Sequence, residues 1–147
     1  MEPPQIELAE PGVVLSTAVF DAPRDRVFDA WTNAATLAQW WGPRGFTNLF
    51  EVHEPKPGGQ WQFVMRGPDG KEFKNHCVYQ EVVPPERLVL KHVSGPVYLA
   101  TFTFEDLGGK TRVRWRMEFE NEKFLASNQA LILSANRDNL EKLAALL

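Results

Sequence analysis

Two stretches of the chain alternate strictly between apolar and polar residues, with the period of two that is typical of half-buried strands. Their apolar sides consist of Trp61, Phe63 and Met65 in the first stretch, and of Val113, Trp115, Met117 and Phe119 in the second. The opposite side of the second stretch is charged and carries Arg112, Arg114, Arg116 and Glu118. Strands of this kind belong to a sheet with one buried and one solvent-facing side, so we expect a single layer covering the buried side.

Turn signals divide the region after residue 46 at hairpin-like intervals. The segments PGG (57–59), GPDG (67–70), PPE (84–86), SGP (94–96) and LGGK (107–110) combine the residues that favour tight turns. They separate five or six short strands, which we expect to form an antiparallel meander. An earlier β-branched stretch, VVLSTAVFD (13–21), predicts one further strand. The expected sheet therefore has about six or seven strands.

Two short helices are predicted between the first strand and the meander. The first lies within residues 22–33, and Asn33 can cap the second. In the second, Leu37, Trp40 and Trp41 have the i, i+3, i+4 spacing of one helix face. Gly42 and Pro43 end it, since glycine favours the C′ position and proline prevents continuation. We expect Trp40 to belong to the core and Trp41 to reach the mouth of a cavity.

The C-terminal segment predicts one long helix, because residues 121–147 contain neither Gly nor Pro. One stripe of this helix is formed by Gln129, Leu133, Asn136, Leu140, Leu143 and Leu147. A helix of this length can cross the whole sheet. The fold class is therefore α+β: a curved antiparallel sheet wrapped on a long C-terminal helix, with two short helices after the first strand.

Composition and charge narrow the class of protein. The 147 residues, 44% of them apolar, fit one domain, for which we expect residues 12–147 preceded by a flexible arm over residues 1–11. The net charge of −3, well mixed along the chain, does not indicate a nucleic-acid partner. No apolar run approaches the roughly 20 residues of a membrane span. The single cysteine, Cys77, is expected to be a buried thiol, and the acidic N-terminus is unlike a signal peptide. We therefore expect a cytoplasmic protein without a membrane partner.

Several longer segments resemble one family in matching order. They are FDAPRDRVFDAWTNAATLAQWWGPRGFT, HEPKPGGQWQFVMRGPDGKEF, YQEVVPPERLVLKH and EDLGGKTRVRWRMEF. The chain is similar here to the activator-of-heat-shock-ATPase-like family of the START-like (SRPBCC, Bet v 1-like, helix-grip) superfamily. Glu54 and Lys56 depart mildly from the Asp and Arg that the family often has there. The resemblance implies a helix-grip fold with a cavity between sheet and long helix, used for apolar ligands or occasionally for cyclisation or hydration. It also implies a possible co-chaperone role in the stress response, although function resides in particular sites and not in the fold.

Residues expected on the inner side of the sheet and on the long helix are candidates for the lining of this cavity. The candidates are Trp41, Phe63, Met65, Tyr79, His92, Tyr98, Phe102, Trp115, Met117, Gln129, Leu133 and Asn136. The alternative is that these residues simply fill the core. A set rich in aromatic residues and methionine suits an adaptable apolar pocket, and a pure core avoids polar groups such as Gln129, Asn136, Tyr79 and His92. These four would orient a ligand by hydrogen bonds.

Other functions leave weaker signals. His53, His76 and His92 lack the spacing of a metal motif, and no phosphate-binding glycine loop or nucleophile elbow is present, so we expect no metal and no cofactor. An enzyme of the cyclase or hydrolase kind would depend on His76, His92 or Glu81, and we name no catalytic residue.

The row Arg112, Arg114 and Arg116 offers a third reading. It is expected to be a solvated surface paired with acids such as Glu105 or Glu118, or else a docking patch for an acidic partner such as a chaperone. A cavity beneath the long helix would favour a small-molecule role over this one. We therefore expect noncatalytic binding of a small apolar or amphipathic ligand by a monomer or homodimer.

Overall fold

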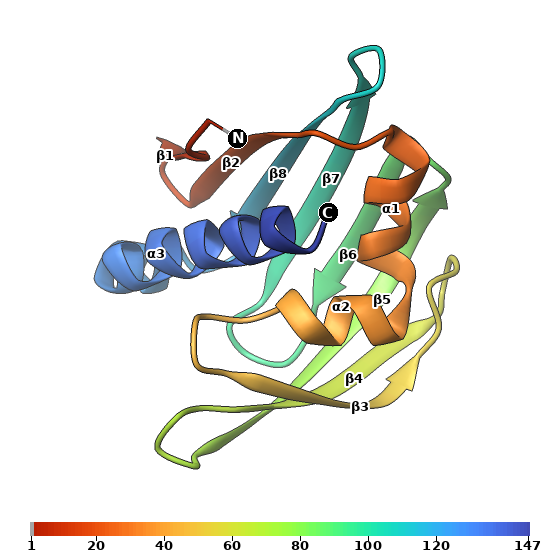
Figure 1. Ribbon diagram of the computed structural model, residues 1–147. Coiled ribbons are helices and arrows are strands. Elements are labelled where there is room, and N and C mark those ends of the chain that lie inside the picture. Colours follow the sequence, from red (N-terminus) through yellow and green to blue (C-terminus); the bar gives the residue numbers. More distant parts are fainter. Residues whose placement is uncertain (1) are drawn as a thin grey trace.

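The computed structural model describes residues 2–147 and consists of one antiparallel sheet with three helices on its inner side (Figure 1). The strands are β1 (Gln5–Glu10), β2 (Val13–Phe20), β3 (Thr47–His53), β4 (Gln60–Arg66), β5 (Glu72–Val83), β6 (Arg87–His92), β7 (Tyr98–Asp106) and β8 (Thr111–Phe119). The helices are α1 (Arg24–Thr32), α2 (Ala34–Trp40) and α3 (Glu122–Leu146). The predicted α+β helix-grip class, with its two short helices and one long one, is confirmed.

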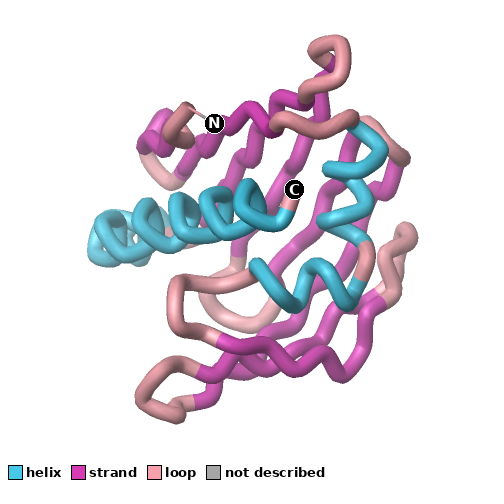
Figure 2. The backbone as a smooth tube through the Cα atoms, in the orientation of Figure 1, coloured by secondary structure: helices cyan, strands magenta, loops and turns pink. Residues whose placement is uncertain are grey.

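The path of the chain explains the order of the strands, β1-β2-β8-β7-β6-β5-β4-β3. Helices α1 and α2 carry the chain from β2 to β3 at the far edge of the sheet, and the meander then returns strand by strand until β8 pairs with β2. Figure 2 shows the resulting curve of the sheet around the long helix. The chain therefore passes from the end of β8 directly into α3.

Over residues 2–147 the sheet has eight strands, so the expected six or seven is corrected. The additional strand is β1, whose residues fall in the segment predicted to be a flexible arm. It pairs antiparallel with β2, with Gln5 opposite Thr17 and Leu8 opposite Val14. Only Ile6 of this strand is half-buried, while the other residues are exposed. A charged, solvent-facing edge strand lacks the apolar alternation by which strands are detected, which is why the sequence did not predict it. Met1 of the predicted arm lies outside the described residues.

The two alternating stretches form β4 and β8 as predicted. Trp61 and Phe63 of β4 and all four apolar residues of β8 are buried, with Met65 half-buried at the end of its strand. On the outer side, Arg112 and Arg114 pair with Glu105, while Arg116 pairs with Glu118 and Glu10. The expected pairing of this row with neighbouring acids is therefore confirmed.

The junction of the two short helices is organised by Asn33 and Trp40. Asn33 caps α2 by accepting a hydrogen bond from the Thr36 amide at 3.1 Å, and Gly42 follows the helix with φ +100°, the left-handed conformation expected at C′. The indole of Trp40 is fully buried and donates to the Ala30 carbonyl at 3.0 Å. That carbonyl lies in the last turn of α1, where carbonyl groups lack partners within the helix. Trp40 is thus a core residue, as predicted.

Helix α3 lies obliquely across the sheet. Asn121 caps its start by accepting hydrogen bonds from the Lys123 and Phe124 amides. The helix packs mainly against β1, β2, β8 and α2. It therefore leans on the side of the curved sheet formed by β1, β2 and β8, while α1 packs against β7. None of the helices formed by residues 2–147 is long and apolar enough to cross a membrane.

Candidate ligand-binding cavity

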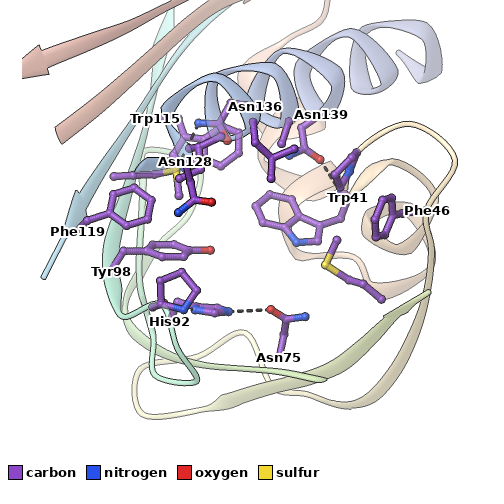
Figure 3. Close-up of a pocket in the computed structure, with 18 of the residues that line it drawn as sticks. Trp41, Phe46, Asn75, His92, Tyr98, Trp115, Phe119, Asn128, Asn136 and Asn139 are labelled. Carbon is purple, nitrogen blue, oxygen red and sulfur yellow. Dashed lines mark hydrogen bonds between the residues drawn. The ribbon is translucent and has the colours of Figure 1, made fainter. Parts of the chain in front are cut away.

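A cavity of about 370 Å³ lies between α3 and the inner face of the sheet, with the α2–β3 loop as a third wall (Figure 3). The sheet side is lined by Phe63, Met65, Asn75, His92, Pro96, Tyr98, Trp115, Met117 and Phe119. The loop contributes Trp41, Gly42, Pro43 and Phe46, and α3 contributes Phe124, Asn128, Leu131, Ile132, Ala135, Asn136 and Asn139. Its size falls within the range of pockets that hold small organic molecules, roughly 300–1,000 Å³.

Eight of the twelve residues nominated from the sequence line this cavity. They are Trp41, Phe63, Met65, His92, Tyr98, Trp115, Met117 and Asn136. The other four, Tyr79, Phe102, Gln129 and Leu133, do not, and their nomination as lining residues is corrected. The structure thus brings together the aromatic and sulfur-containing wall that the sequence indicated, while the polar part of the wall is largely different.

Tyr79 and Phe102 lie on the inner face of the sheet but away from the cavity. The Tyr79 hydroxyl is 3.0 Å from His53 Nε2, so its polar atom is satisfied by a side chain of β3. Phe102 is fully buried, with its ring centroid 5.5 Å from Trp31 and 5.3 Å from Trp115. Both residues therefore fill the core, which was the alternative reading of the sequence.

Gln129 and Leu133 do not line the cavity, because the cavity faces a neighbouring stripe of α3. Four of the α3 residues that line it each precede by one position a member of the predicted stripe: Asn128, Ile132, Ala135 and Asn139. One residue corresponds to a rotation of roughly 100° around a helix. The predicted stripe contains Leu140 and Leu143, which are buried in the core, so it is the face that packs on the sheet. Asn136 lies at the border of the two stripes.

Two asparagines of the cavity stripe have amides whose orientation is fixed by the backbone. Asn128 Nδ2 donates to the Phe124 carbonyl at 2.9 Å, which leaves its Oδ1 as the atom available to a ligand. Asn139 Oδ1 accepts from the Gly42 amide at 2.6 Å, which leaves its Nδ2 available. A carbonyl only accepts and an amide N–H only donates, so neither side chain can be reversed without losing its partner. The sequence analysis missed both, although two asparagines eleven residues apart on one helix face were a usable signal.

His92, Tyr98 and Asn75 form one end of the cavity (Figure 3). The His92 and Tyr98 rings stack, with centroids 4.7 Å apart and planes at 9°. His92 Nδ1 lies 2.6 Å from the Pro96 carbonyl, which can only accept, so this nitrogen carries a hydrogen. Nε2 lies 2.8 Å from Asn75 Oδ1. Both ring nitrogens are thus occupied by protein partners and do not point freely at a ligand.

The protonation of His92 is coupled to the orientation of the Asn75 amide. Burial is the main cause that lowers the pKa of His92, and it outweighs the hydrogen bond to Pro96. A neutral ring accepts at Nε2 and requires the amide nitrogen of Asn75 to face it. A charged ring donates there and matches the Asn75 oxygen, whose amide nitrogen then donates to the Phe73 carbonyl at 3.1 Å. The contacts in the structure, with Asn75 Oδ1 at Nε2, are those of the charged ring, whereas burial lowers the pKa of His92 and favours the neutral one.

The α2–β3 loop, which forms the third wall, is fastened to α3. Besides the Gly42–Asn139 bond, the Arg44 amide donates to Asp138 at 3.1 Å and the Arg44 guanidinium pairs with Glu141 at 3.1 Å. A Cβ on Gly42 would lie 2.9 Å from Met65 Cε, so the loop approaches the sheet closely at this point. These contacts hold Trp41 against Trp61 and Trp115, with ring centroids at 5.4 and 5.5 Å.

The remaining candidate residues lie elsewhere. Glu81 is exposed on β5 and pairs with Arg87 at 3.3 Å, and His76 bonds to Gln60 at 2.9 Å, so only His92 of the acid–base candidates reaches the cavity. Over residues 2–147, no three His, Cys, Asp or Glu side chains are grouped as metal ligands would be. Cys77 is buried, as expected, and burial raises the pKa of its thiol to about 12.

Comparisons with known proteins agree with the fold. The family model of the Activator of Hsp90 ATPase homolog 1-like protein matches residues 21–147. A protein from Arthrobacter aurescens, solved by NMR, is 26% identical with a TM-score of 0.89, covering 96% of this chain and 89% of that one. The AHSA1 protein from Silicibacter pomeroyi is 21% identical with a TM-score of 0.73, covering 90% and 95% of the two chains. A protein from Rhodobacter sphaeroides is 21% identical with a TM-score of 0.87, covering 97% and 96%. Among curated proteins, none matches this chain significantly.

Proposed function

Because the chain belongs to the family of the Activator of Hsp90 ATPase homolog 1-like protein, with its START-like helix-grip fold, we propose that it binds a small apolar or amphipathic molecule in the cavity beneath α3. The observation that carries this proposal is the lining itself. Aromatic rings and methionines form about half of the wall, and three asparagines of α3 place amides among them. A core of the same composition would be packed without such a space.

The affinity expected of this cavity follows from its apolar wall. A planar bicyclic ligand buries about as much surface as an aromatic side chain, roughly 200 Å². At about 25 cal/mol per Å², this burial contributes about 5 kcal/mol, from which the cost of immobilising the ligand is subtracted. Polar contacts with the amides then raise both affinity and selectivity.

Partner binding through the arginine row receives less support. Arg112, Arg114 and Arg116 each pair with a glutamate of this chain, so much of the charge that would attract an acidic partner is already compensated. A cyclase- or hydrolase-like reaction would need a free acid or base in the cavity, and His92 holds both ring nitrogens against protein partners. We therefore favour binding without catalysis.

The proposal is tested by native mass spectrometry of the protein purified from its own organism, followed by denaturing extraction. We expect a retained molecule of fixed mass, or binding of 2-methylnaphthalene to the empty protein in equilibrium dialysis. Ala135 lines the cavity and Ala130 is exposed on the other side of α3, so Ala135→Phe and Ala130→Phe form a matched pair. Binding that is lost only in Ala135→Phe supports the proposal. A clean protein mass with no binding of the probe, or equal loss in both variants, contradicts it.

A further inference from the structure

Asn128 presents a hydrogen-bond acceptor to the cavity. Its amide nitrogen is held by the Phe124 carbonyl one turn earlier in α3, so Oδ1 is the atom that remains for a ligand. Figure 3 shows the side chain reaching from the helix into the cavity. A polar atom placed among aromatic rings gains by meeting a donor there, since burial without a partner costs free energy.

Tyr98 presents a donor from the opposite wall. Its ring lies between His92 and Phe119, with centroids at 4.7 and 5.3 Å, and its hydroxyl points into the cavity (Figure 3). Burial raises the pKa of Tyr98, so the hydroxyl keeps its proton at any ordinary pH. Tyr98 lines the cavity, and its hydroxyl has no hydrogen-bond partner within residues 2–147.

The rest of the lining disfavours an ionised ligand. Its side chains are apolar, aromatic or amide, with His92 as the one titratable base among the described residues of the wall, and both nitrogens of that ring are already bonded. A ligand carboxylate or phosphate would have to leave water without a compensating charge and would face the Asn128 oxygen. A neutral polar group does not meet this cost.

The volume sets the size of the apolar part. An engineered cavity of roughly 150 Å³ holds benzene, so a volume of about 370 Å³ accommodates a molecule of two or three rings. The flat walls offered by Trp41 and Trp115 suit a planar ring system.

We infer that the ligand is a neutral, ring-containing molecule with a hydroxyl group, which donates to Asn128 Oδ1 and accepts from the Tyr98 hydroxyl. The inference rests on the proposed function, because it names the ligand class of the same cavity. A hydroxyl is the smallest neutral group that both donates and accepts. The amphipathic ligand therefore enters with its polar end toward Tyr98 and its rings against the tryptophans.

The test compares 2-naphthol with 2-methylnaphthalene, which has a methyl group in place of the hydroxyl, and with 2-naphthoate. Affinities are measured by equilibrium dialysis at neutral pH. We expect Tyr98→Phe and Asn128→Leu each to weaken 2-naphthol about fivefold to tenfold while 2-methylnaphthalene changes less than about twofold. The matched controls are Tyr79→Phe and Gln129→Leu, which make the same chemical changes outside the cavity wall and should leave both affinities unchanged.

Each result decides the matter. If Tyr98→Phe and Asn128→Leu leave 2-naphthol unaffected, or weaken both neutral ligands equally, the hydroxyl assignment is wrong while binding in the cavity stands. If 2-naphthoate binds most tightly, the ligand class is an acid and the inference is overturned. If the unmodified protein binds none of the three, the proposed function fails together with the inference. The comparison of ligands on the unmodified protein remains informative even if a variant does not fold.

Discussion

Adjacent tryptophans in the sequence should have opposite roles, and replacing each with phenylalanine separates them. Trp40 is fully buried, and its indole N–H donates to the Ala30 carbonyl at 3.0 Å. Trp40→Phe removes that donor and leaves a buried carbonyl in the last turn of α1 unpaired, which costs about 1–3 kcal/mol. The smaller ring adds about 1 kcal/mol of lost packing. We therefore expect the free energy of unfolding to fall by about 2–4 kcal/mol.

Trp41→Phe removes the same atoms from a ring that borders empty space. Trp41 is 8% exposed and lines the cavity, and no hydrogen bond of its indole occurs among the described residues. Its truncation enlarges an existing cavity and does not orphan a polar group, so we expect a loss of about 1 kcal/mol or less. Binding of 2-methylnaphthalene should respond in the opposite order, weakening in Trp41→Phe and remaining unchanged in Trp40→Phe.

Urea unfolding followed by far-ultraviolet circular dichroism measures both stabilities without depending on the replaced fluorophores. The slope of the unfolding free energy against urea should be equal in the three proteins, which confirms that the same surface is exposed. Equal destabilisation by the two substitutions, or a weaker probe affinity in Trp40→Phe alone, would refute the assignment of Trp40 to the core and Trp41 to the wall.

Four further outcomes are expected. Asn139→Ala leaves the Gly42 amide unpaired and should cost about 1–3 kcal/mol in urea unfolding. Gly42→Ala should cost at least about 1 kcal/mol in the same assay, because φ is +100° and the added Cβ would meet Met65. Arg44→Ala breaks only exposed ion pairs and should change stability by less than about 1 kcal/mol, while stopped-flow measurements show faster release of 2-naphthol as the loop loosens. Burial lowers the pKa of His92 below 6.5, so the unfolded chain takes up the proton first; unfolding free energy should fall as pH drops below about 6.5, with a smaller slope in His92→Gln.

The strands and the aromatic wall could be predicted because their signals are local. A period of two places Trp115 and Met117 on the same face of their strand, independently of the rest of the chain. Gly42 ends α2 because glycine readily adopts the left-handed backbone conformation of the C′ position. Strand β1 was not predicted, because its stability comes from pairing with β2 and its side chains remain mostly in solvent. Pairing of an edge strand leaves little trace in an apolar pattern.

The polar part of the cavity could not be predicted, because it depends on which way α3 leans. The apolar pattern identifies the face that contributes most to burial, and this is the stripe of Leu133, Leu140 and Leu143. The cavity stripe is less apolar, since it includes Asn128 and Asn139. Whether Asn128 faces a ligand or solvent is decided by the contacts of α3 with β1, β2 and β8, which only the assembled fold supplies.

The one-residue offset between these stripes assigns stability and selectivity to different side chains of one helix. Leucines on the packing face anchor α3 to the sheet, so substitutions on the neighbouring face that keep the Asn139–Gly42 bond should cost little stability. Replacing Asn128, Ile132 or Ala135 should therefore change mainly which molecule fits, while replacing Leu140 or Leu143 should mainly lower stability. Asn136 lies at the border, where its amide nitrogen bonds Ser16 Oγ at 3.1 Å and the residue also lines the cavity. Its substitution by leucine should affect both properties, which makes it a poor probe of either, and Asn128 and Gln129 are the pair that separates them.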